Sequence, residues 1–107
     1  MLKKRLGIEA IEINWRESIQ HYFKIPSILI IPEGVEGIGV DTFGRCSWLE
    51  KVIIPKSARW IGQFAFWGCY EATIILKKPK SEFKFIGLRA LDDCKEVIED
   101  VEEEVGD

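Results

Sequence analysis

The amino-acid sequence predicts an α+β repeat solenoid of about three short coils, each made of a strand and a helical turn. Three observations support this prediction. A nine-residue motif recurs at intervals of 23 and 25 residues, an Ile-Ile-Pro motif recurs at an interval of 23, and apolar residues occupy matching positions in each copy. A period of about 20 to 30 residues is typical of solenoids, in which each coil buries its apolar side only against its neighbours.

The nine-residue motif defines the register of the coils. Its copies are IGVDTFGRC, IGQFAFWGC and IGLRALDDC, at residues 38–46, 61–69 and 86–94. Stacked coils place equivalent residues about 4.8 Å apart, so each recurring apolar position should form a row through the core. The residues that we assign to such interior rows are Val52 and Ile54; Val35 and Ala58; Ile38, Ile61 and Ile86; Phe43, Phe66 and Leu91; and Cys46, Cys69 and Cys94.

Glycine and proline mark the corners of the coils. Gly39, Gly62 and Gly87 follow the isoleucine of each copy. This placement suits a corner that needs a positive φ or a close approach between neighbouring coils. Pro32 and Pro55 each follow a short apolar run. We expect each proline to end its strand, because proline lacks the N–H group that a ladder requires.

The chain of residues 1–107 is interpreted as one domain with a cap at each end. Caps are expected because a solenoid otherwise exposes the apolar end of its first and last coil. We assign residues 1–27 to an N-terminal cap, residues 28–94 to the repeats of about 23 residues, and residues 95–107 to an acidic C-terminal cap.

Local periodicity predicts the structure of the two caps. Apolar residues alternate within residues 8–15, which predicts a strand, and recur at three- and four-residue steps within residues 16–24, which predicts a short amphipathic helix. Near the other end, Val97, Val101 and Val105 repeat every four residues. We therefore predict an acidic C-terminal capping helix.

The repeated pattern resembles that of a known family. The segments IPEGVEGIGVDTFGRCSWL and IPKSARWIGQFAFWGCYEA are similar to the leucine-rich repeats of the bacterial surface antigen A (BspA) type, which are related to the Treponema-type repeats. The resemblance covers roughly residues 28–98. It implies a non-enzymatic scaffold that binds other proteins, often as a cell-surface adhesin. Because the sequence shows neither a signal peptide nor an apolar run of membrane-spanning length, we expect a cytoplasmic protein with no membrane contact.

Charge is distributed unevenly along the chain. Residues 1–91 hold 14 basic and 9 acidic residues, a net charge of +5, whereas residues 92–107 hold 1 basic and 9 acidic residues, a net charge of −8. The acidic end is interpreted as a solvated helical face that keeps the cap soluble. The alternative is an acidic element that competes for a basic partner.

The sequence offers no arrangement of residues typical of an enzyme or a metal site. Cys46, Cys69, Cys94 and His21 lack the short spacing of zinc ligands, and the cysteines occur in repeat register. No G-x-S-x-G, H-E-x-x-H or phosphate-binding glycine motif is present. We therefore expect no catalytic activity, no metal and no cofactor, and interpret the cysteines as buried apolar residues.

Large aromatic residues occur at the variable positions of the repeat. Tryptophan, tyrosine and arginine dominate binding hot spots in protein interfaces. The predicted protein-binding residues are therefore Trp48, Arg59, Trp60, Trp67 and Tyr70. The alternative is that these large side chains lean over the coil edges and complete a thin core.

Other surfaces suggest other partners. Ile30 and Ile53 are expected to point outward from the sheet, and such an apolar face would allow a homodimer. Basic and aromatic residues alternate between Lys77 and Lys84, a weak signal for nucleic-acid binding, which we interpret as a solvated loop.

The main functional prediction is a non-enzymatic, intracellular protein-binding module. The alternative is a small inhibitor or regulator, such as one encoded by a mobile element, that blocks a nucleic-acid-handling protein through acidic and aromatic surfaces. The high negative charge of residues 92–107 motivates this alternative.

Overall fold

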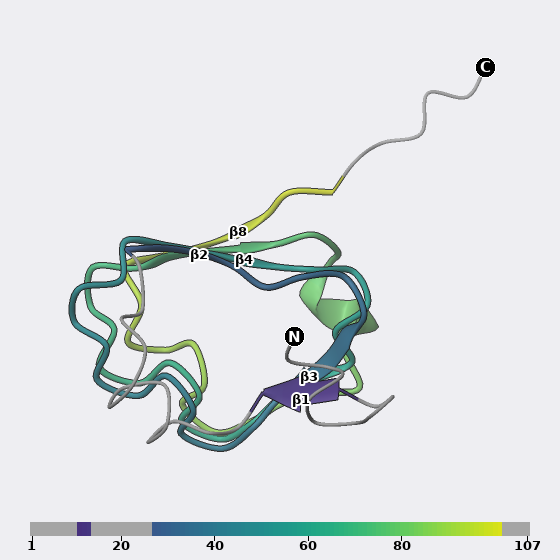
Figure 1. The fold of residues 1–107 in the computed structure, drawn as a ribbon, viewed down its shortest axis with the longest axis horizontal. Helices are drawn as coiled ribbons and strands as arrows, with labels where there is room; N and C mark the ends of the chain where they lie inside the picture. The colour runs from purple at the N-terminus through teal and green to yellow at the C-terminus, as the bar shows by residue number, and fades with distance from the viewer. Residues whose placement is uncertain (1–10, 14–26, 102–107) are drawn as a thin grey trace.

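The computed structural model describes residues 11–13 and 27–101, which form a solenoid with two parallel β-sheets (Figure 1). Sheet A consists, in spatial order, of β1 (Ile11–Ile13), β3 (Val35–Ile38), β5 (Trp60–Ile61) and β7 (Phe85–Ile86). Sheet B consists of β2 (Ile28–Ile30), β4 (Lys51–Ile54), β6 (Thr73–Leu76) and β8 (Glu96–Glu99). A short 3₁₀ turn, η1 (Lys80–Glu82), precedes β7.

Each complete coil contributes one strand to each sheet, and successive coils stack in register. In sheet B, Leu29, Val52, Ile74 and Val97 lie opposite one another on adjacent strands. Because the repeat period brings like residues together, the inward faces of the strands form continuous apolar rows. The predicted solenoid is confirmed, and η1 lies within the longer connection from β6 to β7 that the spacing of 25 residues requires.

The predicted interior rows form the core. The rings of Phe43 and Phe66 stack with their centroids 5.3 Å apart and an interplanar angle of 11°. Cys46 and Cys69 are fully buried, and Cys94 is half-buried at the last coil. Both the phenylalanine row and the cysteine row are therefore confirmed. Ile86, the last member of the predicted isoleucine row, is only partly buried and packs against the core. Other buried residues of the core are Ile31, Val35, Ile38, Leu49, Val52, Ile54, Ala58, Ile61, Ala65, Ala72, Ile74, Leu76, Phe83, Ala90 and Leu91.

The third side of each coil consists of turns and not of the predicted helical turn, so the fold is a β-solenoid and the predicted α+β class was wrong. Along this side, alternate N–H groups bond to the next coil: Asp41 N donates to Gln63 O at 3.0 Å, and Phe43 N donates to Ala65 O at 2.9 Å. The N–H groups between them bond within the coil, as Thr42 N does to Gly39 O. An α-helix would direct every N–H along its own axis, so it would lose these bonds between coils.

The glycines after each isoleucine allow the coils to approach closely. A Cβ atom at Gly62 would lie 2.7 Å from Val40 N, and one at Gly87 would lie 2.5 Å from Gln63 N. Positive φ angles occur instead at Gly34 and Gly68. Of the two roles that the sequence allowed, close approach is therefore the one that Gly62 and Gly87 serve.

The C-terminal helix was predicted wrongly over residues 96–99. This segment is strand β8, and each of its residues pairs in parallel with the equivalent residue of β6. The edge of β6 offers backbone groups that a helix could not satisfy, so the repeat register outweighs the local four-residue spacing. At the other end, β1 confirms the predicted strand, while the predicted helix at residues 16–24 lies outside the described residues.

Candidate functional site

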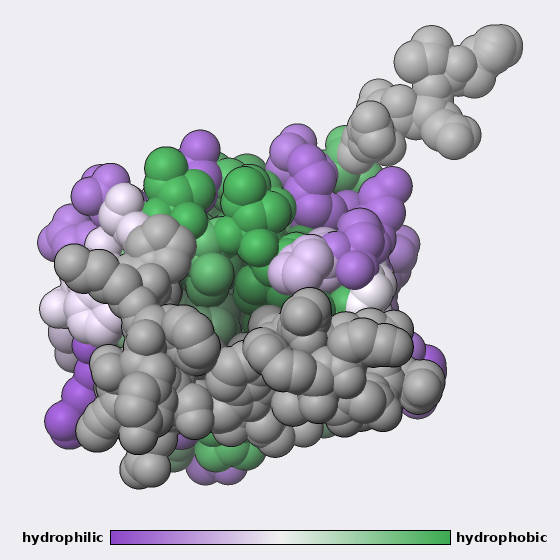
Figure 2. All heavy atoms as spheres, viewed as in Figure 1, coloured by the Kyte–Doolittle hydropathy of each residue, from purple (hydrophilic) through white to green (hydrophobic). Residues whose placement is uncertain are grey.

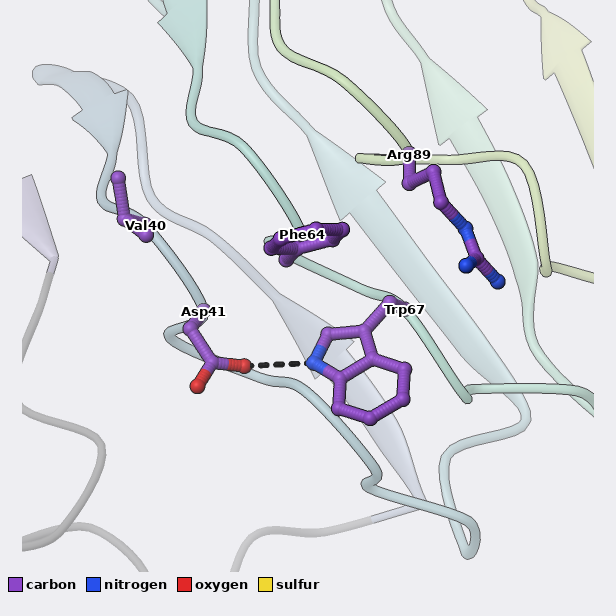
Figure 3. A pocket seen from close by; sticks show the side chains of 5 residues that line it. All are labelled: Val40, Asp41, Phe64, Trp67 and Arg89. Atoms are coloured by element: carbon purple, nitrogen blue, oxygen red, sulfur yellow. Dashed lines mark hydrogen bonds between the residues drawn. The ribbon is translucent and has the colours of Figure 1, made fainter.

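A hollow of about 400 Å³ lies on the third side of the coils, beyond sheet A (Figure 3). Three successive coils line it. The first contributes Val40 and Asp41, the second Phe64 and Trp67, and the third Arg89. The hollow therefore combines two aromatic rings with a carboxylate and a guanidinium group from the coils on either side.

Trp67 is held in place by polar and aromatic contacts. Its Nε1 donates a hydrogen bond of 2.7 Å to Oδ1 of Asp41 in the preceding coil. The guanidinium carbon of Arg45 lies 4.8 Å from the centroid of the indole ring, and the ring of Phe64 meets it edge to face at 6.1 Å. These contacts fix the indole orientation while leaving the side chain half-buried.

Gly44 provides the space on which this arrangement depends. A Cβ atom at Gly44 would overlap Oδ1 of Asp41 and would lie 2.5 Å from Nε1 of Trp67. The hydrogen-bonded pair of Asp41 and Trp67 therefore packs directly against the backbone at Gly44, which lies in the coil before that of Trp67. Gly37 has the same role on sheet A, because a Cβ atom there would overlap the indole ring of Trp60.

Three equivalent positions around the hollow have left-handed backbone conformations. The φ angles are 59° at Asp41, 60° at Phe64 and 51° at Arg89. Aspartate tolerates this region, whereas phenylalanine and arginine adopt it at a conformational cost on the order of 1 kcal/mol each. The backbone of the repeat imposes the conformation, so the identity of these side chains is not explained by backbone preference.

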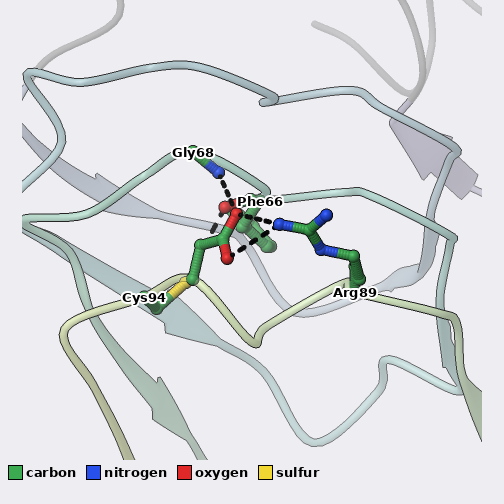
Figure 4. Close-up of polar contacts among 5 residues, drawn as sticks. Phe66, Gly68, Arg89 and Cys94 are labelled. Atoms are coloured by element: carbon green, nitrogen blue, oxygen red, sulfur yellow. Dashed lines mark hydrogen bonds and ion pairs between the residues drawn. The ribbon is translucent and has the colours of Figure 1, made fainter.

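The guanidinium group of Arg89 is oriented by Asp93. One nitrogen of Arg89 lies 3.2 Å from both carboxylate oxygens of Asp93, and Oδ2 of Asp93 also accepts a 3.0 Å hydrogen bond from Gly68 N (Figure 4). The bond from Gly68 N and then the contact with Arg89 hold the pKa of the Asp93 carboxyl below its ordinary value. Arg89 therefore presents a fixed cation at one margin of the hollow.

The cysteine row behaves as part of the core. Burial raises the pKa of both Cys69 and Cys94 to about 12. The thiol of Cys69 donates to Phe43 O at 3.1 Å, and that of Cys94 to Phe66 O at 3.8 Å, the same relation one coil later. Protonated, hydrogen-bonded thiols of this kind are poor nucleophiles and poor metal ligands. Residues 11–13 and 27–101 contain no cluster of three metal-ligating side chains, and His21 lies outside those ranges.

The structure places the five predicted binding residues on two sides of the coil, at sheet A and in the turns that lead from sheet A to sheet B. Trp60 and Arg59 lie at sheet A, where the Trp60 indole covers Gly37. Trp48 and Tyr70 are exposed in the turns that follow the cysteine row. Trp67 lies at the hollow.

The sequence reasoning missed four residues that accompany Trp67. These are Asp41, Arg45, Phe64 and Arg89. The repeat register contained the signal, since Asp41, Phe64 and Arg89 are equivalent positions of three copies and differ in every copy. Variable residues at one equivalent position, on one side of a solenoid, are candidates for partner recognition.

The basic stretch makes contacts between coils. Lys77 Nζ forms an ion pair of 2.8 Å with Asp100. Lys78 Nζ donates to Lys56 O at 2.9 Å and lies 4.7 Å from the ring centroid of Phe83. Lys77 and Lys78 therefore make contacts that stabilise the stacking of the coils.

The comparisons with known proteins identify the repeat. The sequence model of the BspA type leucine-rich repeat region, with six copies, matches residues 17–102. No curated protein and no solved structure matches the chain. No helix in the described ranges has the length and apolar character needed to cross a bilayer. Repeats of this kind serve as scaffolds for protein interaction, typically without catalytic activity. Because the match spans most of its length, the chain belongs to the BspA-type leucine-rich repeat family.

Proposed function

We propose that this chain is an intracellular protein-binding module whose main contact surface is the hollow around Trp67. The observation that carries the proposal is the Trp67 cluster: an oriented indole, a second aromatic ring, and charged groups of both signs brought together from three coils. Interface hot spots are enriched in tryptophan and arginine that are held in place before binding.

The conformational cost at Phe64 and Arg89 supports the same proposal. Asparagine or glycine would adopt the left-handed backbone of these positions more readily. Natural proteins keep such locally unfavourable residues mainly where function requires them. A role in contacting a partner would account for two large side chains at this place.

The partner that fits this surface is a protein segment with an apolar side chain flanked by charged residues. The apolar side chain would pack on Phe64 and Trp67, while an acidic residue would meet Arg89. Arg45 and Arg89 lie on the two sides of the aromatic pair, which favours a segment with more acidic than basic residues.

Two glycine substitutions distinguish the Trp67 surface from the Trp60 surface. Gly44→Ala inserts a methyl group under Asp41 and Trp67, and Gly37→Ala inserts one under Trp60. Neither glycine has a positive φ, so each substitution displaces an indole without removing it. The two variants are therefore matched controls for each other.

The measurement is affinity capture from cells of the source organism with each variant as bait, followed by quantitative mass spectrometry. We expect the specific partner to be retained by the unsubstituted chain and by Gly37→Ala, and to be reduced at least tenfold with Gly44→Ala. Thermal unfolding of each bait confirms that it is folded. If the partner were lost only with Gly37→Ala, the binding site would lie at sheet A instead. If all three baits retained the partner equally, both surfaces would be refuted.

A further inference from the structure

The outer face of sheet B carries a row of isoleucines. Ile30, Ile53, Ile75 and Ile98 are in register on β2, β4, β6 and β8. Ile30 is 64% exposed and Ile98 is 38% exposed, while the two between them are half-buried by their neighbours. In Figure 2 apolar side chains gather along the upper edge of the molecule, where Figure 1 places sheet B. This row forms a flat apolar stripe across four coils.

A second outward row runs beside the isoleucines and carries two charges of opposite sign. It consists of Ile28, Lys51, Thr73 and Glu96, again in register on the four strands. Lys51 on β4 and Glu96 on β8 have opposite charges and lie on the two sides of β6. The second row therefore has opposite charges on the two strands that flank β6, while β2 lies beyond β4 with no counterpart beyond β8 in the described part of the chain.

We propose that sheet B is the interface of a homodimer whose two-fold axis runs parallel to β6. A two-fold rotation about this axis places Lys51 of each copy opposite Glu96 of the other, so one arrangement forms two ion pairs. The same rotation places Ile53 opposite Ile98 of the second copy, and Ile75 opposite itself. The surface complements a second copy of itself in both apolar contact and charge.

Neighbouring registers of the same face are disfavoured by charge. An axis along β4 would place Lys51 opposite Lys51 of the second copy, which repels. An axis midway between β4 and β6 would place Glu96 opposite the apolar Ile28, which buries a carboxylate without a partner. Charge therefore selects β6 as the axis.

The dimer should be weak, because the face is small. With the axis along β6, three strands of four residues each face the second copy (β4, β6 and β8), and at a spacing of about 4.8 Å they cover roughly 14 by 13 Å. This flat footprint is well below the roughly 800 Å² per partner that specific, stable interfaces bury. The association must accordingly be measured over a concentration range that extends to about 1 mM protein, by sedimentation equilibrium of the full chain.

The deciding experiment exchanges the two charges. Lys51→Glu and Glu96→Lys should each raise the dissociation constant of the homodimer at least tenfold, because each places like charges opposite each other. An equimolar mixture of these two variants should recover association to within about threefold of the original. In the mixed dimer, the introduced glutamate of one variant faces the introduced lysine of the other. The remaining Glu96 of the first variant faces the remaining Lys51 of the second, so both pairs are of opposite sign. The double variant should recover in the same way.

Lys84→Glu, at an exposed position before β7, is the matched control and should leave association unchanged. Circular dichroism of each variant verifies the fold. A chain that remains monomeric at about 1 mM overturns the proposal. So does a dimer that is equally sensitive to Lys84→Glu, or one that the mixture of the two variants fails to restore. The outcome is independent of the Trp67 surface, which lies on another side of the coil.

Discussion

Replacing Gly62 with alanine tests whether the spacing of the coils limits the stability of the solenoid. A Cβ atom at this position would lie 2.7 Å from Val40 N, 2.8 Å from Gly39 C and 2.9 Å from Ile38 O. All three atoms belong to the backbone of the preceding coil, so no side chain can rotate away. Since favourable contacts begin near 3.5 Å, the two coils must separate by roughly 0.6–0.8 Å.

The separation has an energetic cost that follows from these distances. Overpacking by one methyl group costs about 1–3 kcal/mol. The same movement lengthens the 2.7 Å bond from Gly62 N to Ile38 O, and a backbone hydrogen bond contributes about 1 kcal/mol. We expect a loss of about 3 kcal/mol in the free energy of unfolding, which corresponds to a fall of roughly 12–24 °C in Tm for a domain of this size.

The assay is urea unfolding followed by circular dichroism, with Gly34→Ala as the control. Gly34 has a φ of 103°, and a Cβ atom there would meet no other atom within 4 Å. Its substitution should therefore cost only the conformational term of about 1–2 kcal/mol. If Gly62→Ala costs no more than Gly34→Ala, the coils tolerate separation and the close-approach argument is refuted.

Three further predictions concern the core and the titrating groups. Phe66→Ala should lower the free energy of unfolding by about 3–5 kcal/mol in urea, because it removes a fully buried ring from the stacked row; a loss below about 1 kcal/mol would contradict this packing. The pKa of about 12 at Cys69 and Cys94 lies above the ordinary 9.0, so the folded state retains protons that the unfolded state releases. The contribution of the two thiols to the free energy of unfolding should be fully present below pH 9 and should decline between pH 9 and 12. Urea unfolding at a series of pH values from 8 to 10.5 should show this decline, and Cys94→Ala should make it smaller. The pKa of the Asp93 carboxyl should lie below 3.8 in an NMR titration and should rise in Arg89→Ala; an unchanged pKa in that variant would remove Arg89 as a cause.

The interior of the fold could be predicted from the sequence because the repeat itself carries the information. Once Ile38, Ile61 and Ile86 are aligned, the pairing of strands β3, β5 and β7 follows without knowledge of tertiary contacts. The stacking of Phe43 on Phe66 follows from the same alignment. In a solenoid the neighbours of a residue lie one repeat period away in the sequence. Its contacts in the next coil can therefore be predicted by adding that period to its residue number.

The candidate site was predicted less completely, because residue type alone does not indicate where an exposed side chain points. Trp60 and Trp67 differ little as sequence positions, since each flanks an inward apolar residue. The structure gives them different surroundings: Trp60 packs over a glycine of sheet A, whereas Trp67 bonds to Asp41 of the preceding coil at a hollow. The direction depends on the left-handed conformations of the turns, which Phe64 and Arg89 adopt against their own preference.

The error at the C-terminus shows which sequence signal has priority in a repeat protein. The spacing of Val97 and Val101 favours a helix when this segment is considered alone. An offset of 23 residues, however, aligns Glu96–Glu99 with Thr73–Leu76, and in both segments two β-branched apolar residues occupy the middle positions. A strand here satisfies the edge of β6 through parallel pairing along all four residues, whereas a helix would satisfy only its own backbone and leave that edge open. For residues 96–99, the hydrogen bonds offered by the preceding coil therefore outweigh local periodicity, and extending the repeat offset by one copy is the better predictor.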